Sequence, residues 1–285
     1  MVSSISRGRA TEMERRETQI WMRYDGSFAG LLCAADEISI DPRHRRETPR
    51  FFSAHNPEDL FEPAFSVETD LARARILWRE AAARGYRESL TTCFEAFCSD
   101  LTGAKDALGR VLAAILRETK TSGGRSGRRY NHLLDLSDPD ILTTTKASER
   151  SRHQAHKITG LVRFSELPSG LWYASIHPDC DVLPLIGKHF SLRFPKMRFV
   201  IHDLRRSSAI LREPGESWRI VEGLSLPGAA SALDLPSSER ESIVRDLWRN
   251  YFESVAIKAR KNPSLQRQFM PQKYWDALPE MNPRA

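Results

Sequence analysis

The sequence predicts an α+β fold, in which a helical N-terminal half precedes an antiparallel sheet of hairpins covered by helices. Before Gly160 the apolar residues recur at intervals of three and four, whereas after Gly160 they alternate with polar residues. The later segments follow the order hairpin, helix, hairpin, helix. Helices followed by hairpins are typical of an α+β domain with its helices on one face of the sheet.

We expect one folded domain over residues 18–280, preceded by a flexible N-terminus at residues 1–17. Within the domain, residues 18–157 form the helix-rich part and residues 158–280 the sheet-and-helix part. A chain of 285 residues is long enough to bury a large core. The stretch 121–131 combines three glycines with three arginines and has no periodicity, which indicates a mobile basic loop.

The composition bears on the partners, the cysteine chemistry and the membrane association that we expect of the protein. Lys and Arg number 43 against 37 Asp and Glu, and the net charge of +6 favours polyanionic partners without requiring them. The four cysteines show no CxxC spacing, so we expect reduced thiols in a cytoplasmic protein, with neither a zinc ribbon nor a disulfide framework. No apolar run resembles a signal peptide or a membrane span, so we expect no membrane partner.

The N-terminal half begins with a short strand at 18–24, where apolar and polar residues alternate, and continues with a helical stretch at 28–38. Residues 41–63 show no sustained period, so we expect an irregular connection there. Thr69 and Asp70 are placed to cap a helix that Gly85 ends. Two further helical patterns follow, at residues 87–101 and 104–120.

The C-terminal half contains two predicted hairpins. The first pairs 160–167 with 170–178, and the second pairs 198–204 with 207–213, with an edge strand at 217–223. Between the hairpins, residues 181–194 have a helical period and begin at Asp181, a plausible cap.

A long C-terminal helix is predicted after Ser238 and Glu241, which form a capping box. We expect Asn262 and Pro263 to end it. The helix carries a wide apolar stripe made of Val244, Leu247, Trp248, Tyr251, Phe252 and Val255.

No motif for a nucleotide, a zinc protease or a serine hydrolase is present, so we expect no cofactor. His153 and His156 are three residues apart and share one helical face, but no third ligand follows from the spacing, so we expect no metal site. Two interpretations of the region around them stay open. His153, His156 and Lys157 either neutralise a helix C-terminus, or His156 and Arg163, on the following strand, hold an anionic group in a cleft.

Two other stretches have a structural and a functional interpretation. In "YDGSF", residues 24–28, Asp25 or Ser27 caps a helix, or the free N–H groups of the helix start bind a phosphate. From Arg240 to Trp275 the sequence carries eight Lys or Arg against three acids. These cations either contact phosphates, with Tyr274 and Trp275 stacking on bases, or lie on a solvated face while the aromatic residues dock on the core.

The stretch "RFVIHDLRR", 198–206, places His202 and Asp203 side by side. On a regular strand the two side chains point to opposite faces, so they form a poor catalytic pair. Arg205 and Arg206 follow at the hairpin turn, where a cation reaches a phosphate or a partner more easily. Asp203 with Arg206 is therefore the better functional candidate.

Several motifs resemble, in order, those of a bacterial family called domain of unknown function 4130. They are "YDGSFAGLLCA", "HKITGLVRF", "YASIHPDCDVLPLIGKHFSLRFP", "FVIHDLRR" and "LWRNYFESVAIKARKNPSLQRQFMPQKYW". The resemblance runs from about residue 20 to residue 278. It implies a role in DNA metabolism beside a radical-SAM protein or a uracil-DNA glycosylase-like domain.

Three hypotheses follow from the residues and the resemblance. The chain is a DNA-binding accessory that acts with a radical-SAM or uracil-DNA glycosylase-like partner, an enzyme acting directly on DNA, or a scaffold that binds protein alone. The catalytic candidates are His156, Asp203, His189 and Asp25. The candidates for binding DNA are Arg163, Arg193, Arg205, Arg206, Arg260, Lys261, Arg267 and Lys273.

Overall fold

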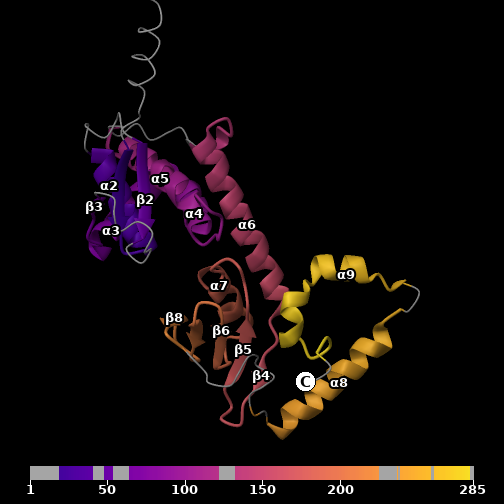
Figure 1. Ribbon diagram of the computed structural model, residues 1–285. Coiled ribbons are helices and arrows are strands. Elements are labelled where there is room, and N and C mark those ends of the chain that lie inside the picture. Colours follow the sequence, from indigo (N-terminus) through magenta and orange to yellow (C-terminus); the bar gives the residue numbers. More distant parts are fainter. Residues whose placement is uncertain are drawn as a thin grey trace, which may run out of the picture. The chain divides into compact units, whose positions relative to one another are not determined.

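The computed structural model describes residues 19–40, 48–53, 64–121, 132–224, 236, 238–257 and 260–282. Residue contacts divide the chain into an N-terminal unit, Met1–Glu149, and a C-terminal unit, Arg150–Ala285 (Figure 1). Helices and two sheets confirm the α+β class. The expected single domain over 18–280 stays a prediction, and the basic loop expected at 121–131 lies almost wholly outside the described residues.

The N-terminal unit is built on a small parallel sheet. β1 (Gln19–Tyr24) is its central strand, between β2 (Thr48–Ser53) and β3 (Ala64–Ser66). α2 (Phe28–Ile40) lies between β1 and β2 in sequence, as parallel pairing requires a crossover. The irregular connection expected at 41–63 is wrong for residues 48–53, which form β2. Its Pro49 interrupts the strand pattern, but an edge strand tolerates proline.

Helices complete the N-terminal unit. α3 (Leu71–Ala81) begins as expected at Asp70, whose carboxylate accepts hydrogen bonds from the backbone N–H groups of Ala72 and Arg73. Gly85 has a φ of 102° and kinks the chain between α3 and α4, as a glycine can. The remaining elements are η3 (Ala82–Tyr86), α4 (Arg87–Phe97), α5 (Ala104–Thr121) and η4 (His132–Leu134).

Asp36 is the buried charge of the N-terminal unit. Its carboxylate lies 2.6 Å from Arg73 Nη2 and also contacts Lys120 Nζ. A buried carboxylate needs such partners, because without them its desolvation would cost several kcal/mol, on the order given for buried ions. These two cations therefore stabilise the fold.

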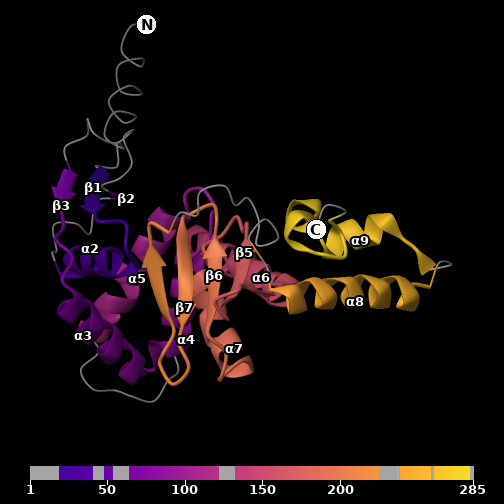
Figure 2. The ribbon, with the colours of Figure 1, turned by 90° about the horizontal axis from the view of Figure 1, so that it is seen from below.

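The C-terminal unit contains a five-stranded sheet in the order β4-β5-β6-β7-β8. Figure 2 shows β5, β6 and β7 side by side. The strands are β4 (Ser165–Glu166), β5 (Trp172–Ile176), β6 (Phe199–Asp203), β7 (Ser208–Arg212) and β8 (Arg219–Glu222). The antiparallel pairs β4–β5 and β6–β7 confirm both predicted hairpins, and β8 confirms the edge strand.

One strand pair differs from the expected antiparallel sheet. β5 and β6 are parallel, because α7 (Leu183–Arg193) crosses over between them. Val182 is the N-cap of α7, so the expected cap at Asp181 is wrong. α6 (Pro139–Leu161) also extends further than expected, and Arg163 therefore lies in the connection after α6 instead of on a strand.

The core of the C-terminal unit lies between α7 and the sheet. Leu183, Ile186 and Phe190 of α7 belong to the same buried cluster as Phe199 and Ile201 of β6. Val200, on the opposite face of β6, belongs to a smaller cluster. The sheet therefore has one thickly covered face, and its side chains alternate between faces as expected.

The chain ends in two helices and a short 3-10 turn. α8 (Glu239–Val255) begins at Ser238, whose Oγ accepts a hydrogen bond from the Glu241 N–H at 3.1 Å. α8 ends at Val255, not at Asn262, which instead caps α9 (Pro263–Phe269) through the Leu265 N–H. η7 (Gln272–Ala277) follows. We call residues 239–269 the C-terminal arm, which projects beyond the sheet in Figures 1 and 2.

No helix in the described ranges is both long and apolar enough to cross a membrane. All four cysteines are buried free thiols. Within the same ranges, no group of three or more His, Cys, Asp or Glu residues could hold a metal ion.

Candidate functional site

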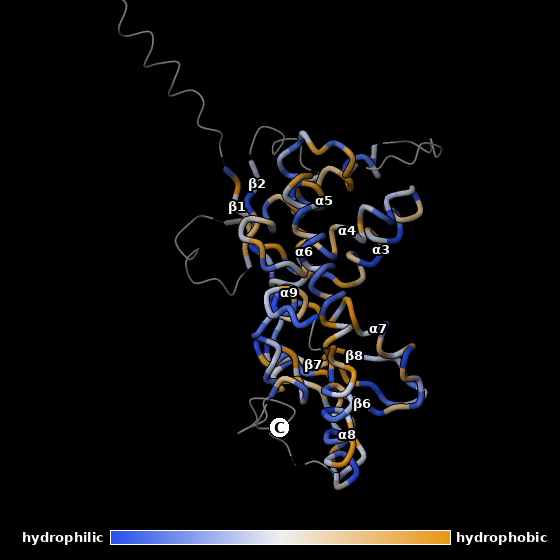
Figure 3. The backbone as a smooth tube through the Cα atoms, turned by 90° about the vertical axis from the view of Figure 1, so that its right-hand side faces the viewer, coloured by the Kyte–Doolittle hydropathy of each residue, from blue (hydrophilic) through white to orange (hydrophobic). Residues whose placement is uncertain are grey.

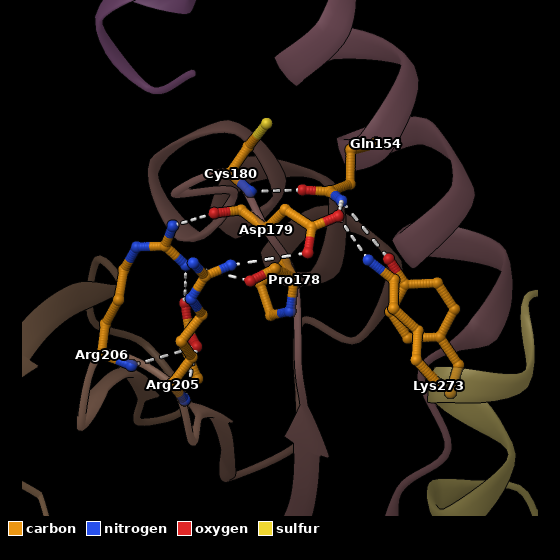
Figure 4. Close-up of polar contacts among 9 residues, drawn as sticks. Gln154, Pro178, Asp179, Cys180, Arg205, Arg206 and Lys273 are labelled. Atoms are coloured by element: carbon orange, nitrogen blue, oxygen red, sulfur yellow. Dashed lines mark hydrogen bonds and ion pairs between the residues drawn. The ribbon is translucent and has the colours of Figure 1, made fainter. Parts of the chain in front are cut away.

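The carboxyl ends of β5 and β6 bring two loops together. Residues 177–182 follow β5, and the turn 204–207 follows β6. Because β5 and β6 are parallel, both loops lie at the same edge of the sheet, where ligands bind in many proteins with parallel strands. Figure 4 shows the polar contacts at this edge.

Asp203, the last residue of β6, anchors the turn. Its side chain is 0% exposed and lies 2.9 Å from Arg206 Nη1. The same carboxylate accepts hydrogen bonds from the backbone N–H groups of Arg205 at 3.0 Å and Arg206 at 3.3 Å. Asp203 therefore fixes the turn and aims the Arg206 side chain, as a buried carboxylate with several donors does.

Arg206 joins the two loops. Besides Asp203, its guanidinium donates to the backbone carbonyl of Pro178 at 3.2 Å and to that of Asp179. Five N–H donors in a planar fork make arginine suited to such a bridge. Arg206 thus holds the loop after β5 against the turn after β6, which is a positioning role.

Asp179 is the centre of the cluster. Its carboxylate lies 3.4 Å from Arg205 Nη1 and also contacts Lys273 Nζ from η7. Gln154 of α6 donates to it at 3.1 Å, and Gln154 Oε1 accepts the Cys180 N–H at 2.6 Å. Burial alone would lower the pKa of Lys273, but the hydrogen bond with Asp179 raises it above its ordinary value. Lys273 is therefore positively charged at neutral pH.

A hollow of about 180 Å³ opens beside this cluster. Its lining combines apolar groups with polar groups from β5, the loop after β5 and η7. The polar lining residues are Ser175, His177, Lys273, Tyr274 and Asp276, and the apolar ones include Ile158, Leu161 and Ile176. Burial raises the pKa of the Tyr274 phenol, so this hydroxyl stays protonated and acts as a hydrogen-bond donor or acceptor.

α6 adds exposed cations next to the hollow. Residues 150–157, "RSRHQAHK", contain three Lys or Arg and two His and no acid. Gln154 faces the Asp179 cluster, and His153 and Lys157, four residues apart, share an exposed face beside it. Cations from α6, the β6–β7 turn and η7 therefore lie around this edge of the sheet, together with the carboxylates of Asp179, Asp203 and Asp276.

The structure gives the four catalytic candidates different local environments. Asp25 belongs to the N-terminal unit and accepts hydrogen bonds from the Ser27 N–H and Oγ, while Ser27 caps α2. Burial alone would raise the pKa of Asp25, but the hydrogen bonds from Ser27 lower it. His156 is exposed on α6, and His189 is exposed on α7 with its ring 5.0 Å from that of Phe190. Neither has a hydrogen bond or ion pair with Asp203 within the described residues.

His202 has a structural environment. Its Nδ1 lies 2.7 Å from the Tyr173 hydroxyl and its Nε2 lies 3.0 Å from the Leu224 carbonyl. Burial lowers the pKa of His202, although the Leu224 carbonyl and Asp203 oppose the shift. The expectation that His202 and Asp203 point to opposite faces is therefore met, and His202 is a core residue.

The cations predicted to bind DNA separate into three groups. Arg205, Arg206 and Lys273 converge on the Asp179 cluster. Arg163 pairs with Glu280 at 2.8 Å and lies over the Trp248 ring, so it secures the base of the arm. The others are exposed away from the cluster: Arg193 at the end of α7, and Arg260, Lys261 and Arg267 in the arm.

Sequence reasoning did not identify Asp179, Gln154, His177 or Asp276. Asp179 and His177 follow the apolar strand 172–176, and acidic or basic residues directly after a strand are a usable signal when the strand is parallel to its neighbour. Gln154 and Asp276 come from segments far away in sequence, so no local pattern marks them.

A family model described as a domain of unknown function, DUF4130, matches residues 113–280. A putative [LysW]-aminoadipate semialdehyde/glutamate semialdehyde transaminase of Aeropyrum pernix is 26% identical over 217 residues. That match covers 73% of the chain and 53% of the transaminase, so the chain spans about half the length of the curated relative it matches. No solved structure matches the chain.

Proposed function

We propose that this chain, which belongs to the domain of unknown function 4130 family, is a DNA-binding accessory protein in DNA repair or modification. We propose further that it acts in the cytoplasm with a radical-SAM or uracil-DNA glycosylase-type partner, as the resemblance to the family implies. The single observation that carries the proposal is the gathering of cations around the carboxyl ends of β5 and β6.

A phosphate group can take the place of the carboxylate in this cluster. Arg205 and Lys273 both contact Asp179, and their side chains are 53% and 39% exposed. A phosphate oxygen accepts the same charge-assisted hydrogen bonds as a carboxylate oxygen and carries comparable charge. A phosphate backbone lying along His153 and Lys157 would therefore reach Arg205 and Lys273 as well.

Arg206 is excluded from this role by its contacts. It already donates to Asp203 and to two backbone carbonyls. Its substitution should disturb the loops, whereas substitution of Arg205 or Lys273 should change binding with little effect on folding.

The test is a fluorescence-anisotropy titration of single- and double-stranded oligonucleotides with the full chain. If about four phosphates are contacted, the affinity should fall about a hundredfold between about 50 and 200 mM salt. The variant Arg205→Gln with Lys273→Gln should bind more weakly by tenfold or more, on the order expected for two lost charge-assisted contacts. Salt-insensitive binding by the wild type would contradict the proposal.

Arg198→Gln is the matched control. Arg198 is 55% exposed and pairs with Glu213 at 2.7 Å, much as Arg205 pairs with Asp179. However, Arg198 precedes the amino end of β6, the opposite end from the cluster. A loss of affinity in Arg198→Gln equal to that in the single variant Arg205→Gln would show that total charge, not this site, determines binding.

The hollow favours one second candidate, an enzyme that acts directly on DNA. His177 and Asp276 line it together with Lys273, so acid-base residues are present beside the cation cluster. In that case His177 takes the role expected of His156. Mass spectrometry of an oligonucleotide after incubation with the wild type and with His177→Gln tests this candidate. An unchanged mass with the wild type, or equal product from His177→Gln, would exclude it.

A further inference from the structure

The C-terminal arm exposes a continuous apolar stripe. Leu247 is 62% exposed, and Ile243, Val244, Tyr251 and Val255 are also exposed. Hydrophobic positions recur along α8 in Figure 3. Single exposed apolar side chains are ordinary, but a stripe of this kind along one helix face is the mark of an interaction surface.

The stripe leads into a groove between the end of α8 and α9. The hollow there measures about 780 Å³. Its apolar lining includes Phe252, Val255, Ile257, Leu265 and Phe269. Phe269 is 66% exposed, whereas Tyr274 is 6% exposed and belongs to the core cluster, so the interpretation in which the aromatic residues dock on the core holds for Tyr274 but not for Phe269.

The arm is attached to the rest of its unit by polar contacts. Glu280 pairs with Arg163 and accepts a hydrogen bond from Trp248 Nε1 at 3.0 Å, and Arg249 Nε donates to the Pro279 carbonyl. At the start of α8, Glu241 accepts the Glu166 N–H. These contacts engage Trp248 of the apolar stripe, whereas Val244, Leu247 and Tyr251 stay exposed.

The charges of the arm indicate that a molecule bound to it is acidic. Between residues 246 and 269 the sequence carries five Lys or Arg against two acids, namely Arg249, Lys258, Arg260, Lys261 and Arg267 against Asp246 and Glu253. Arg260 and Lys261 line the groove itself, together with one acid, Glu253. An acidic segment is attracted to this rim, whereas a second copy of the arm would bring two basic surfaces together.

The apolar residues distinguish a protein from a nucleic acid. Unpaired bases stack on aromatic rings, but most of the exposed stripe is aliphatic, as Ile243, Val244 and Leu247 show. Proteins bind an amphipathic helix in an apolar groove, into which the helix inserts apolar residues that are three and four positions apart.

We propose that the C-terminal arm is a docking surface for an acidic amphipathic helix of a partner protein. The helix lays its apolar side on the α8 stripe and in the groove, and its acidic residues face Arg260 and Lys261. This docking does not depend on the DNA binding proposed above.

The probe is a displayed library of amphipathic helices of about 20 residues, each with a leucine stripe and randomised Glu, Gln or Lys beside it. Selection on the full chain should enrich acidic helices that bind saturably. The variant Leu247→Ser with Phe269→Ser should weaken the best helix at least about tenfold. The control Ile76→Ser with Leu192→Ser removes apolar residues that are 54% and 72% exposed elsewhere, and it should bind normally.

A charge swap gives a second, independent readout. In Arg260→Glu with Lys261→Glu, the selection should shift from acidic to basic helices, because the groove is kept while its rim is reversed. The proposal is overturned if no helix is enriched, if basic or neutral helices are enriched on the wild type, or if the Ile76 and Leu192 control loses binding equally. It is also overturned if sedimentation shows a wild-type dimer that Leu247→Ser with Phe269→Ser dissociates, since a second copy would then occupy the arm.

Discussion

Two helices of the C-terminal unit carry apolar residues at the same spacing, and only one of them is buried. On α7 the residues are Leu183, Ile186 and Phe190, at most 3% exposed. On α8 they are Val244, Leu247 and Tyr251, which are 49%, 62% and 57% exposed. Equal periodicity thus serves two purposes. In α7 it builds the core under the sheet, and in α8 it leaves an exposed apolar surface.

The difference also separates two ways of stabilising a helix. Packing against the sheet stabilises α7, where each buried aliphatic side chain contributes about 1.5–3 kcal/mol. α8 has 17 residues and relies on its Ser238 cap, on the Arg245–Glu241 ion pair and on the polar contacts at its base. Such a helix is marginal alone, so binding a partner should stabilise it further.

The largest expected effect is the difference in stability between a leucine-to-alanine substitution in α7 and the same substitution in α8. Leu183→Ala should lower the free energy of unfolding by about 2–5 kcal/mol, because it leaves a cavity in the core. Leu247→Ala should change it by less than about 0.5 kcal/mol, because the side chain is exposed. Urea unfolding of both variants measures the contrast, and equal losses would mean that α8 is packed in solution.

The next effect concerns the base of the arm. The Glu280 side chain is 1% exposed and is bound by Arg163 and Trp248, so Glu280→Gln should cost about 1.5–3 kcal/mol of local stability. Hydrogen exchange at the α8 amides should become faster, while exchange in β6 stays unchanged. Glu253→Gln, an exposed change on the same helix, is the control. Unaltered α8 exchange in Glu280→Gln would show that other contacts hold the arm.

The smallest effect is a pH dependence inside the sheet. Burial lowers the pKa of His202 below its ordinary 6.5, so the unfolded chain takes up a proton more readily than the folded one. The stability from neutral His202 is complete above pH 6.5 and is lost as the pH falls towards the pKa of the folded state. Unfolding free energies at pH 5.5 and 7.5 should therefore differ less in His202→Gln than in wild type. The exposed His189→Gln should keep the wild-type difference.

Local sequence patterns predicted which segments form helices and strands better than they predicted which strands pair and in which direction. Alternation identified the hairpin strands at Ser165–Glu166 and Phe199–Asp203, and short polar side chains identified the caps at Asp70 and Ser238. The parallel pairing of β5 with β6 was missed, because side-chain alternation does not encode the direction of the neighbouring strand. β2 was missed because Pro49 breaks its pattern.

The candidate site was predicted only in part for the same reason. Arg205, Arg206 and Lys273 were identified as cations of interest, but their convergence depends on Asp179, which lies 94 residues before Lys273 in the chain. The stripe on α8 was also predicted. What it faces depends on the rest of the fold and on a partner, and helical spacing carries no information about either.

The salt dependence of DNA binding by Arg205→Gln tests the central claim most directly. Because Arg205 should contact a phosphate, the slope of log affinity against log salt should become shallower by about one relative to wild type. Arg198→Gln should keep the wild-type slope. If Arg205→Gln keeps it as well, or if Arg198→Gln changes it equally, the cluster at the ends of β5 and β6 is not where the protein binds DNA.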